Sequence, residues 1–158
     1  MIKFLKYTYL ALLLFIITAA TGCSDPNAVI DQNNEIANKN WSYHNKLGYD
    51  VKIDDASVPY NLYLNLRVTG DYKYANIFVL ISNPDIKGAT TRYEFRLANP
   101  DGEWLGQGSG SLYSFQMPFR KNYKFPAAGT YRIQIEQNMR DNPLHDVSDV
   151  GLRVEKAQ

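Results

Sequence analysis

The sequence contains little of what disulfides, zinc fingers and nucleic-acid-binding surfaces are made from. It has one cysteine among 158 residues, which excludes an internal disulfide and a cysteine-based zinc finger. Its 17 lysines and arginines nearly balance 16 aspartates and glutamates, and the net charge of +1 provides no basic surface for DNA or RNA. We therefore expect no nucleic-acid partner.

Residues that commonly carry catalysis are also scarce. The two histidines, His44 and His145, are about a hundred positions apart, too few to form a zinc site and with no Gly-x-Ser-x-Gly motif beside them. The glycines of Gly106–Gly110 lack the Lys-Ser/Thr pair of a phosphate loop and the third glycine of a dinucleotide loop. The sequence predicts a protein that is not an enzyme and has no cofactor or metal.

The most hydrophobic part of the chain is its beginning. Lys3 and Lys6 precede an uncharged stretch, Tyr7–Gly22, whose 16 residues fall short of the ~20 needed for a permanent membrane-spanning helix. A basic start, an apolar middle and small residues at the end are typical of a secretory signal peptide. We predict that residues 1–22 are such a signal; the alternative is an uncleaved membrane anchor.

The only cysteine follows this segment directly. Ala20-Thr21-Gly22-Cys23 resembles a bacterial lipobox, although Ala20 stands where leucine is more usual. A thiolate is the nucleophile needed to form a thioether with diacylglycerol, and several acyl chains give stable anchoring. We therefore expect Cys23 to carry lipid and to attach the protein to a membrane of the cell envelope, with the outer membrane favoured over the inner one.

Residues 23–40 are polar and rich in asparagine, and we predict that they form a flexible tether. Within them, Val29–Ile36 could form a short edge strand. The folded domain is expected to cover residues 41–158.

Alternation of apolar and polar residues recurs throughout that domain. It is clearest at Tyr60–Val68, where it predicts that Leu62, Leu64 and Leu66 share a buried face. Asn76–Ser82 is apolar on both faces, as a central strand would be. Further short strands are expected at Val51–Ile53, Tyr93–Leu97, Leu112–Phe119, Tyr131–Ile135 and Val150–Val154.

Turn residues separate these runs, and no stretch of ten residues after the signal has helical periodicity. Seven or eight antiparallel strands with one apolar face each must stack as two sheets or close into a barrel. We predict an all-β, antiparallel β-sandwich, with a jelly roll as one possible arrangement.

Large aromatic residues near the predicted strand ends suggest one kind of binding surface. Trp41, Tyr72 and Trp104 could form a flat patch on which sugar rings stack, as in a lipid-anchored carbohydrate-binding module. The alternative is that these side chains pack in the core or at its rim.

The stretch between the last two predicted strands is longer than a hairpin connection requires. About a dozen residues separate Gln137 from Val150, whereas a hairpin needs two to five. Long loops often carry function and arginine is favoured at interaction hot spots, so we predict a partner surface here. Its candidate residues are Arg140, Asp141, Asn142, Leu144 and His145.

Two other interpretations of this stretch remain open. Arg140 could instead pair with a nearby carboxylate and fasten the loop. The oxygen-bearing side chains between Asn138 and Asp149 could also hold calcium, although an ordinary loop has the same composition.

Five motifs in one order resemble the GldH family, the gliding-motility lipoproteins of the Bacteroidota. They are Pro59–Arg67, Thr69–Tyr72, Pro100–Gly106, Glu136–Leu144 and Asp149–Glu155. The resemblance extends from Trp41 to Lys156, and a signal with a lipid-bearing cysteine precedes it as in that family.

The resemblance implies a non-enzymatic lipoprotein that is required for gliding. It also implies a functional link to the type IX secretion machinery, made through contacts with other envelope proteins. No catalytic residue is transferred, because none is known for the family.

Overall fold

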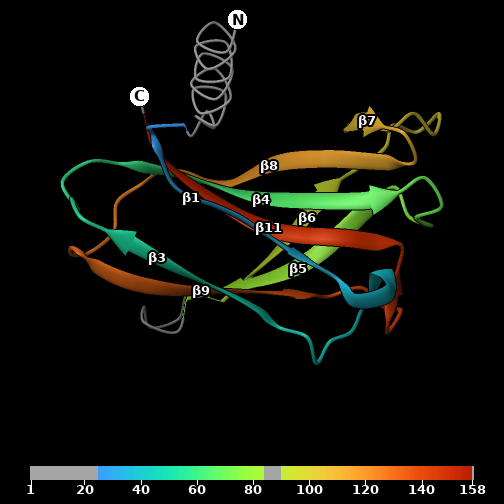
Figure 1. Ribbon diagram of the computed structural model, residues 1–158, viewed down its shortest axis with the longest axis horizontal. Coiled ribbons are helices and arrows are strands. Elements are labelled where there is room, and N and C mark those ends of the chain that lie inside the picture. Colours follow the sequence, from blue (N-terminus) through green and yellow to red (C-terminus); the bar gives the residue numbers. More distant parts are fainter. Residues whose placement is uncertain (1–24, 84–89, 158) are drawn as a thin grey trace, which may run out of the picture.

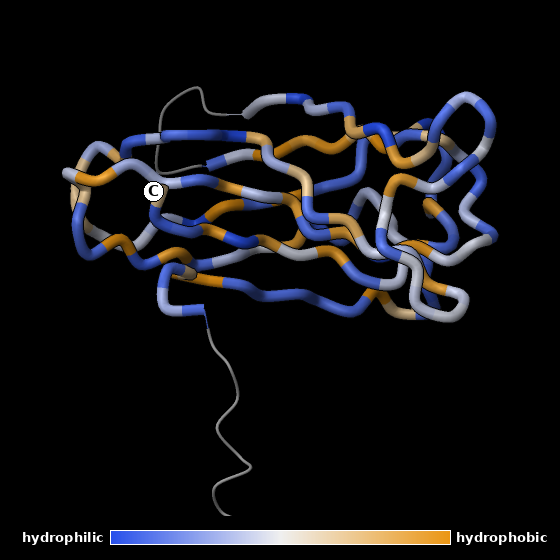
Figure 2. The backbone as a smooth tube through the Cα atoms, turned by 90° about the horizontal axis from the view of Figure 1, so that it is seen from above, coloured by the Kyte–Doolittle hydropathy of each residue, from blue (hydrophilic) through white to orange (hydrophobic). Residues whose placement is uncertain are grey.

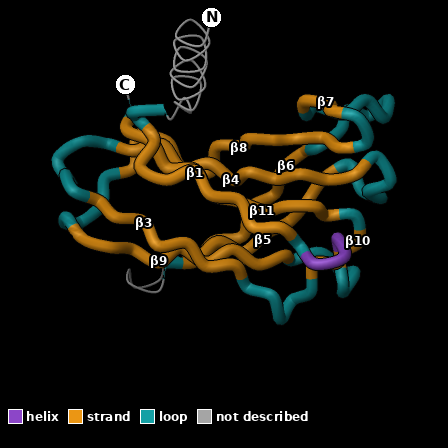
Figure 3. Tube along the Cα trace, viewed as in Figure 1, coloured by secondary structure: helices purple, strands orange, loops and turns teal. Residues whose placement is uncertain are grey.

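The computed structural model describes residues 25–83 and 90–157, and in these the chain is built almost entirely from β-strands (Figure 3). The one helical element is a short 3-10 turn, η1, at Ala37–Lys39. The strands are β1 (Ala28–Glu35), β2 (Asn40–Trp41), β3 (Leu47–Ile53), β4 (Tyr60–Thr69), β5 (Asn76–Ser82), β6 (Thr91–Arg96), β7 (Gln107–Ser109), β8 (Leu112–Tyr123), β9 (Gly129–Gln137), β10 (Leu144–His145) and β11 (Val147–Lys156).

Two antiparallel sheets form the two layers of the molecule (Figure 1). The first has the strand order β1-β11-β4-β8-β7, and the second has the order β3-β9-β5-β6. The small strands β2 and β10 pair only with each other. The predicted all-β antiparallel sandwich is confirmed.

The eight strands of six or more residues are arranged as a jelly roll. Without the short β7, the sheets read β1-β11-β4-β8 and β3-β9-β5-β6, which is the order produced by two interlocked Greek keys. The described residues contain eleven strands rather than seven or eight. The difference comes largely from β2, β7 and β10, whose two or three residues are too few for an alternating pattern to be visible.

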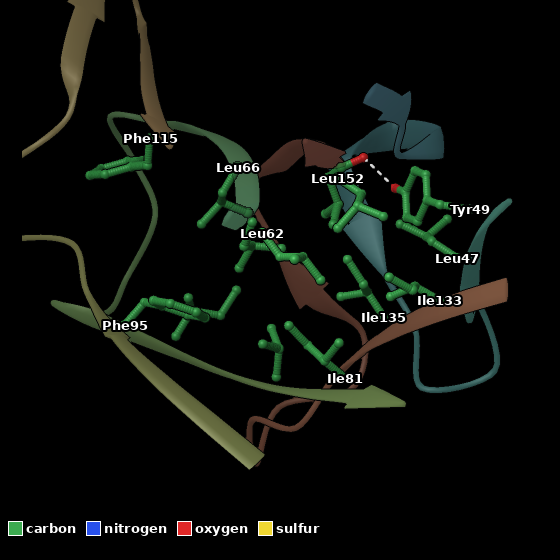
Figure 4. Close-up of a cluster of buried hydrophobic side chains, with 14 of the residues drawn as sticks. Leu47, Tyr49, Leu62, Leu66, Ile81, Phe95, Phe115, Ile133, Ile135 and Leu152 are labelled. Atoms are coloured by element: carbon green, nitrogen blue, oxygen red, sulfur yellow. Dashed lines mark hydrogen bonds between the residues drawn. The ribbon is translucent and has the colours of Figure 1, made fainter. Parts of the chain in front are cut away.

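The core lies between the two sheets, and β4 supplies its centre. Leu62, Leu64 and Leu66 are at most 3% exposed, as the alternation predicted. Ile81 and Ile135 of the second sheet are buried in the same hydrophobic cluster (Figure 4). Fully burying a leucine contributes about 1.5–3 kcal/mol, so this face of β4 is a major source of stability.

Hydrophobic and hydrophilic positions alternate along the strands (Figure 2). The remaining polar groups of the core are bonded internally. The Tyr49 hydroxyl, for example, donates to the carbonyl oxygen of Val150 on the opposite sheet at 2.7 Å. No buried side-chain nitrogen or oxygen in residues 25–83 and 90–157 lacks a hydrogen-bond partner.

The folded domain begins earlier than predicted. β1 pairs along its length with β11, so the flexible-tether prediction is wrong from Ala28 onward and the alternative edge strand over Val29–Ile36 is close to what forms. The segment looks like a tether in the sequence because one face of an edge strand stays in solvent. Its order comes from backbone pairing, from the buried Ile36, and from Arg153, which holds Asp31 at 2.8 Å.

The predicted signal peptide, residues 1–22, and the lipid-bearing Cys23 lie outside the described residues. In the part of the chain that is described, no helix has the length and apolar character required to cross a bilayer.

Candidate functional site

The connection between β9 and β11 is organised around one buried amide. Gln137, the last residue of β9, is 1% exposed. Its Oε1 accepts the backbone N–H of Met139 at 2.8 Å, and its Nε2 donates to the carbonyl oxygens of Asp141 at 3.0 Å and Trp41 at 3.4 Å. One side chain therefore fixes the start of this connection.

The segment that contains β2 supports the same connection from the other side. Trp41 and Leu144 face each other in the β2–β10 pair, and both are buried. The Tyr43 backbone N–H donates to Oδ1 of Asn142 at 2.9 Å, and the Tyr43 hydroxyl donates to the carbonyl oxygen of Met139. The connection is a braced structure rather than a loose loop.

Its second half is fastened to β4. The Thr69 hydroxyl donates to Oδ1 of Asp146 at 3.0 Å, and the Thr69 backbone N–H donates to the carbonyl oxygen of Asp146 at 2.9 Å. His145 places Nδ1 2.6 Å from Oδ1 of Asn40. Most of Asn138–Asp146 is thus held by neighbours from distant parts of the chain.

A groove of about 470 Å³ lies beside this connection, on the outer face of the second sheet. We call it the loop groove; it is lined by Tyr74, Phe78, Arg92, Asn138, Met139, Arg140 and Asp141. The guanidinium of Arg92 lies 3.8 Å from the centre of the Phe78 ring, and its Nε donates to Oδ1 of Asn138 at 2.7 Å. The Phe78 backbone N–H donates to the sulfur of Met139 at 3.2 Å, which fixes the buried methionine.

The electrostatics of the loop groove favour an anion. The hydroxyl of Tyr74 donates to Asp141, and this bond, together with Lys73 at 3.7 Å, lowers the pKa of the carboxyl group. Asp141 is therefore ionised and already partnered. Among the described residues, no carboxylate oxygen comes within 4.0 Å of the guanidinium of Arg92 or of Arg140.

The predicted partner surface is only partly as expected. Arg140 and Asp141 do line the groove, and Asn142 and His145 are exposed beside it. Leu144 is 1% exposed and belongs to the core, so its assignment to the surface is wrong. The alternative in which Arg140 fastens the loop through a carboxylate finds no such partner in the described part of the chain.

Sequence reasoning missed the half of the groove that comes from β5, β6 and the segment before β5. Phe78 and Arg92 are 60 and 46 positions before Asn138, and no local pattern connects them to it. One signal was available, because a strand that is apolar on both faces implies that its outward side chains are also covered.

The predicted aromatic patch is wrong as a surface. Trp41 is fully buried and Tyr72 is 4% exposed. Trp104 packs with its ring centre 5.2 Å from that of Tyr113 and 6.5 Å from that of Tyr72. These rings are core and rim packing, the alternative reading of the sequence, and they leave no flat stacking platform at these positions.

The carboxylates of the same connection do not converge on a common point. Asp141 is bonded to Tyr74, Asp146 to Thr69, and Asp149 to Arg67. Within residues 25–83 and 90–157, no group of three or more histidine, cysteine, aspartate or glutamate side chains could hold a metal ion.

Comparison with known proteins places this fold and surface in context. Residues 28–154 match the family model described as GldH lipoprotein. The chain is 31% identical over 153 residues to a gliding motility lipoprotein GldH homolog of Christiangramia forsetii, covering 91% of this chain and 93% of the relative. It is 27% identical over 141 residues to the gliding motility lipoprotein GldH of Flavobacterium johnsoniae, covering 84% and 87%. No solved structure gives a significant match.

Proposed function

The chain belongs to the GldH lipoprotein family, and from this premise we propose that it serves gliding motility by binding other envelope proteins and not by catalysis. The resemblance drawn from the five sequence motifs is confirmed by the family match. The proposal further includes a functional link to the type IX secretion machinery. The proposed mode of action is supported by a braced surface loop and by the scarcity of catalytic residue types in the sequence.

We propose that Cys23 carries the lipid and that residues 1–22 are removed as the signal peptide. The lipobox-like sequence ending at the only cysteine supports this proposal. Attachment to the outer membrane, and palmitate among the acyl chains, are part of the same proposal.

The loop groove is the surface we propose for the protein partner, and one observation carries the proposal. Arg140 is exposed on a rigidly held connection, and no described carboxylate neutralises it or Arg92. Phe78, Tyr74 and Met139 line the same groove as these two cations. Arginine pairs strongly with carboxylates and is frequent at interface hot spots, so the groove suits an acidic segment that also carries an apolar side chain.

The test replaces Arg140 with alanine in cells that glide or that secrete by the type IX route. Because Arg140 is exposed and has no carboxylate partner in residues 25–83 and 90–157, Arg140→Ala should leave the melting temperature unchanged. A hot-spot arginine costs about 2 kcal/mol or more on truncation, so capture of the partner by the tagged lipoprotein should fall about thirtyfold, and gliding or secretion with it. Lys121→Ala, which removes an exposed positive charge from β8, is the matched control and should retain both partner capture and gliding or secretion.

Normal gliding, secretion and capture by Arg140→Ala, with unchanged stability, would exclude the loop groove as the partner surface. A large loss of stability in the same variant would show instead that Arg140 is a structural residue.

A further inference from the structure

We propose that a second groove, on the outer face of the first sheet, binds an oligosaccharide. This sheet groove has a volume of about 690 Å³, within the range of about 300–1,000 Å³ typical of sites for small ligands. Its floor is formed by β1, β4 and β8, and its far wall by residues 105–107 together with Arg96 of β6. It lies on the opposite layer from the loop groove and goes beyond the function proposed above.

A row of hydrogen-bonded side chains crosses four strands along the floor. Arg153 Nη1 donates to Oδ2 of Asp31 at 2.8 Å, Asn65 Nδ2 donates to Oδ1 of Asp31 at 2.8 Å, and Gln116 Nε2 donates to Oδ1 of Asn65 at 3.2 Å. Asn65 is 9% exposed, although it points to the solvent side of its strand. The row is therefore fixed before any ligand arrives, which lowers the entropy lost on binding.

The charged side chains of the floor are paired with one another, so the groups left to hydrogen-bond a ligand are mainly side-chain amides. Asp31 is neutralised by Arg153, and Arg67 is paired bidentately with Asp149 at 2.8 and 2.9 Å. A carboxamide both donates and accepts hydrogen bonds. Gln116 keeps a carbonyl oxygen and one N–H without a described partner.

A ligand that complements carboxamides must itself both donate and accept along its length, as the hydroxyl groups of a sugar do. The rim adds an apolar contact for the C–H face of a sugar ring, because Leu105 is 51% exposed, one of two large hydrophobic residues exposed in the described chain. Arg96 lines the same wall with no carboxylate within 4.0 Å among the described residues. We therefore expect an acidic oligosaccharide, such as a uronate oligomer, to bind more tightly than a neutral one.

The wall of the groove depends on one glycine. A Cβ atom on Gly106 would lie 2.7 Å from the ring of Phe115 and 2.8 Å from the carbonyl oxygen of Ser114. Only glycine allows residues 105–107 to pass so close to β8. The position of Leu105 at the rim follows from this close approach.

The experiment uses the full-length lipoprotein in a detergent without sugar head groups. Oligomannuronate, mannan oligomers and cello-oligosaccharides are each titrated and followed by calorimetry and saturation-transfer NMR. We expect oligomannuronate to bind at micromolar to millimolar concentrations. Gln116→Ala should weaken binding about fivefold, the effect of one neutral hydrogen bond, and Arg96→Ala should abolish the preference for the uronate.

Gln32→Ala is the matched control, because Gln32 lies on β1, bonds to Asn34 and does not line the groove. It should bind as the wild type does, and so should Arg140→Ala, which separates this proposal from the previous one. Absence of binding by all three oligosaccharides at millimolar concentration would overturn the proposal. So would equal affinities for the wild type, Gln116→Ala and Arg96→Ala, because binding would then occur elsewhere.

Discussion

Gln137 gives the sharpest test of how the candidate partner surface is built. Replacing it with alanine removes the acceptor for the Met139 N–H and the donor to the carbonyl oxygens of Asp141 and Trp41. Each of the two shorter bonds contributes about 1 kcal/mol net, and the groups left behind are buried, so Gln137→Ala should lower the free energy of unfolding by about 2–4 kcal/mol. We expect the melting temperature to fall by about 7–14 °C.

The assay is urea unfolding of the purified protein followed by circular dichroism. Gln137→Met keeps most of the side-chain volume but none of the hydrogen bonds, so a loss close to that of Gln137→Ala would assign the effect to bonding rather than packing. Gln134→Ala, three residues earlier on β9 and only half-buried, should change stability by no more than about 0.5 kcal/mol. Equal, small effects at positions 137 and 134 would refute the view that one amide organises the connection.

Three further outcomes are expected. Leu64→Ala should lower the free energy of unfolding by about 2–5 kcal/mol, because it truncates a fully buried leucine. Asn65→Ala should cost about 1–3 kcal/mol, because its amide is hydrogen-bonded on both sides, whereas the alternating pattern alone would predict a change within about 0.5 kcal/mol. Equal losses below about 0.5 kcal/mol at both positions would contradict the strand register. Cys23→Ser should leave an unprocessed precursor without fatty-acid label, and normal labelling of that variant would exclude the proposed anchor. Burial raises the pKa of Tyr49 and of Tyr72 above the ordinary value of 10.0, so the folded state keeps these phenols neutral while the unfolded state ionises them. The free energy of unfolding should therefore fall as the pH rises above 10, and Tyr49→Phe should reduce the difference between unfolding experiments at pH 9 and pH 11.

The parts of the fold that were predictable are those where one face of a strand is buried. The pattern of β4 identified Leu62, Leu64 and Leu66 as core residues, because any strand with one buried and one solvent-exposed face shows a two-residue period. β1 has no such pattern, since its pairing with β11 uses backbone groups that every residue has. Its membership of the sheet is decided by its partner and not by its own side chains.

The candidate site shows the same division. The length of the β9–β11 connection pointed to Arg140 and Asp141 from sequence alone. Whether a large side chain in a loop faces inward is decided by tertiary packing, and Leu144 faces inward because Trp41, about a hundred positions away, pairs with it. The contribution of Arg92 depends likewise on the neighbouring sheet positions, which a single sequence does not reveal.

The early start of β1 also determines how the domain is presented to its surroundings. Only four residues separate Cys23 from Ala28, a chain length that spans at most about 18 Å. Lipid on Cys23 would hold the adjacent end of the sandwich, where the Lys156 N–H donates to the carbonyl oxygen of Asn27, close to the bilayer.

From that end β1 runs about 26 Å toward η1 and the Asn138–Asp146 connection at the opposite end of the molecule (Figure 1). The domain would then stand upright on the membrane, with the loop groove on its side near the end far from the lipid. The short link would thus fix the height and orientation at which a partner meets the groove. Lengthening it by flexible residues would leave the fold intact and remove that alignment.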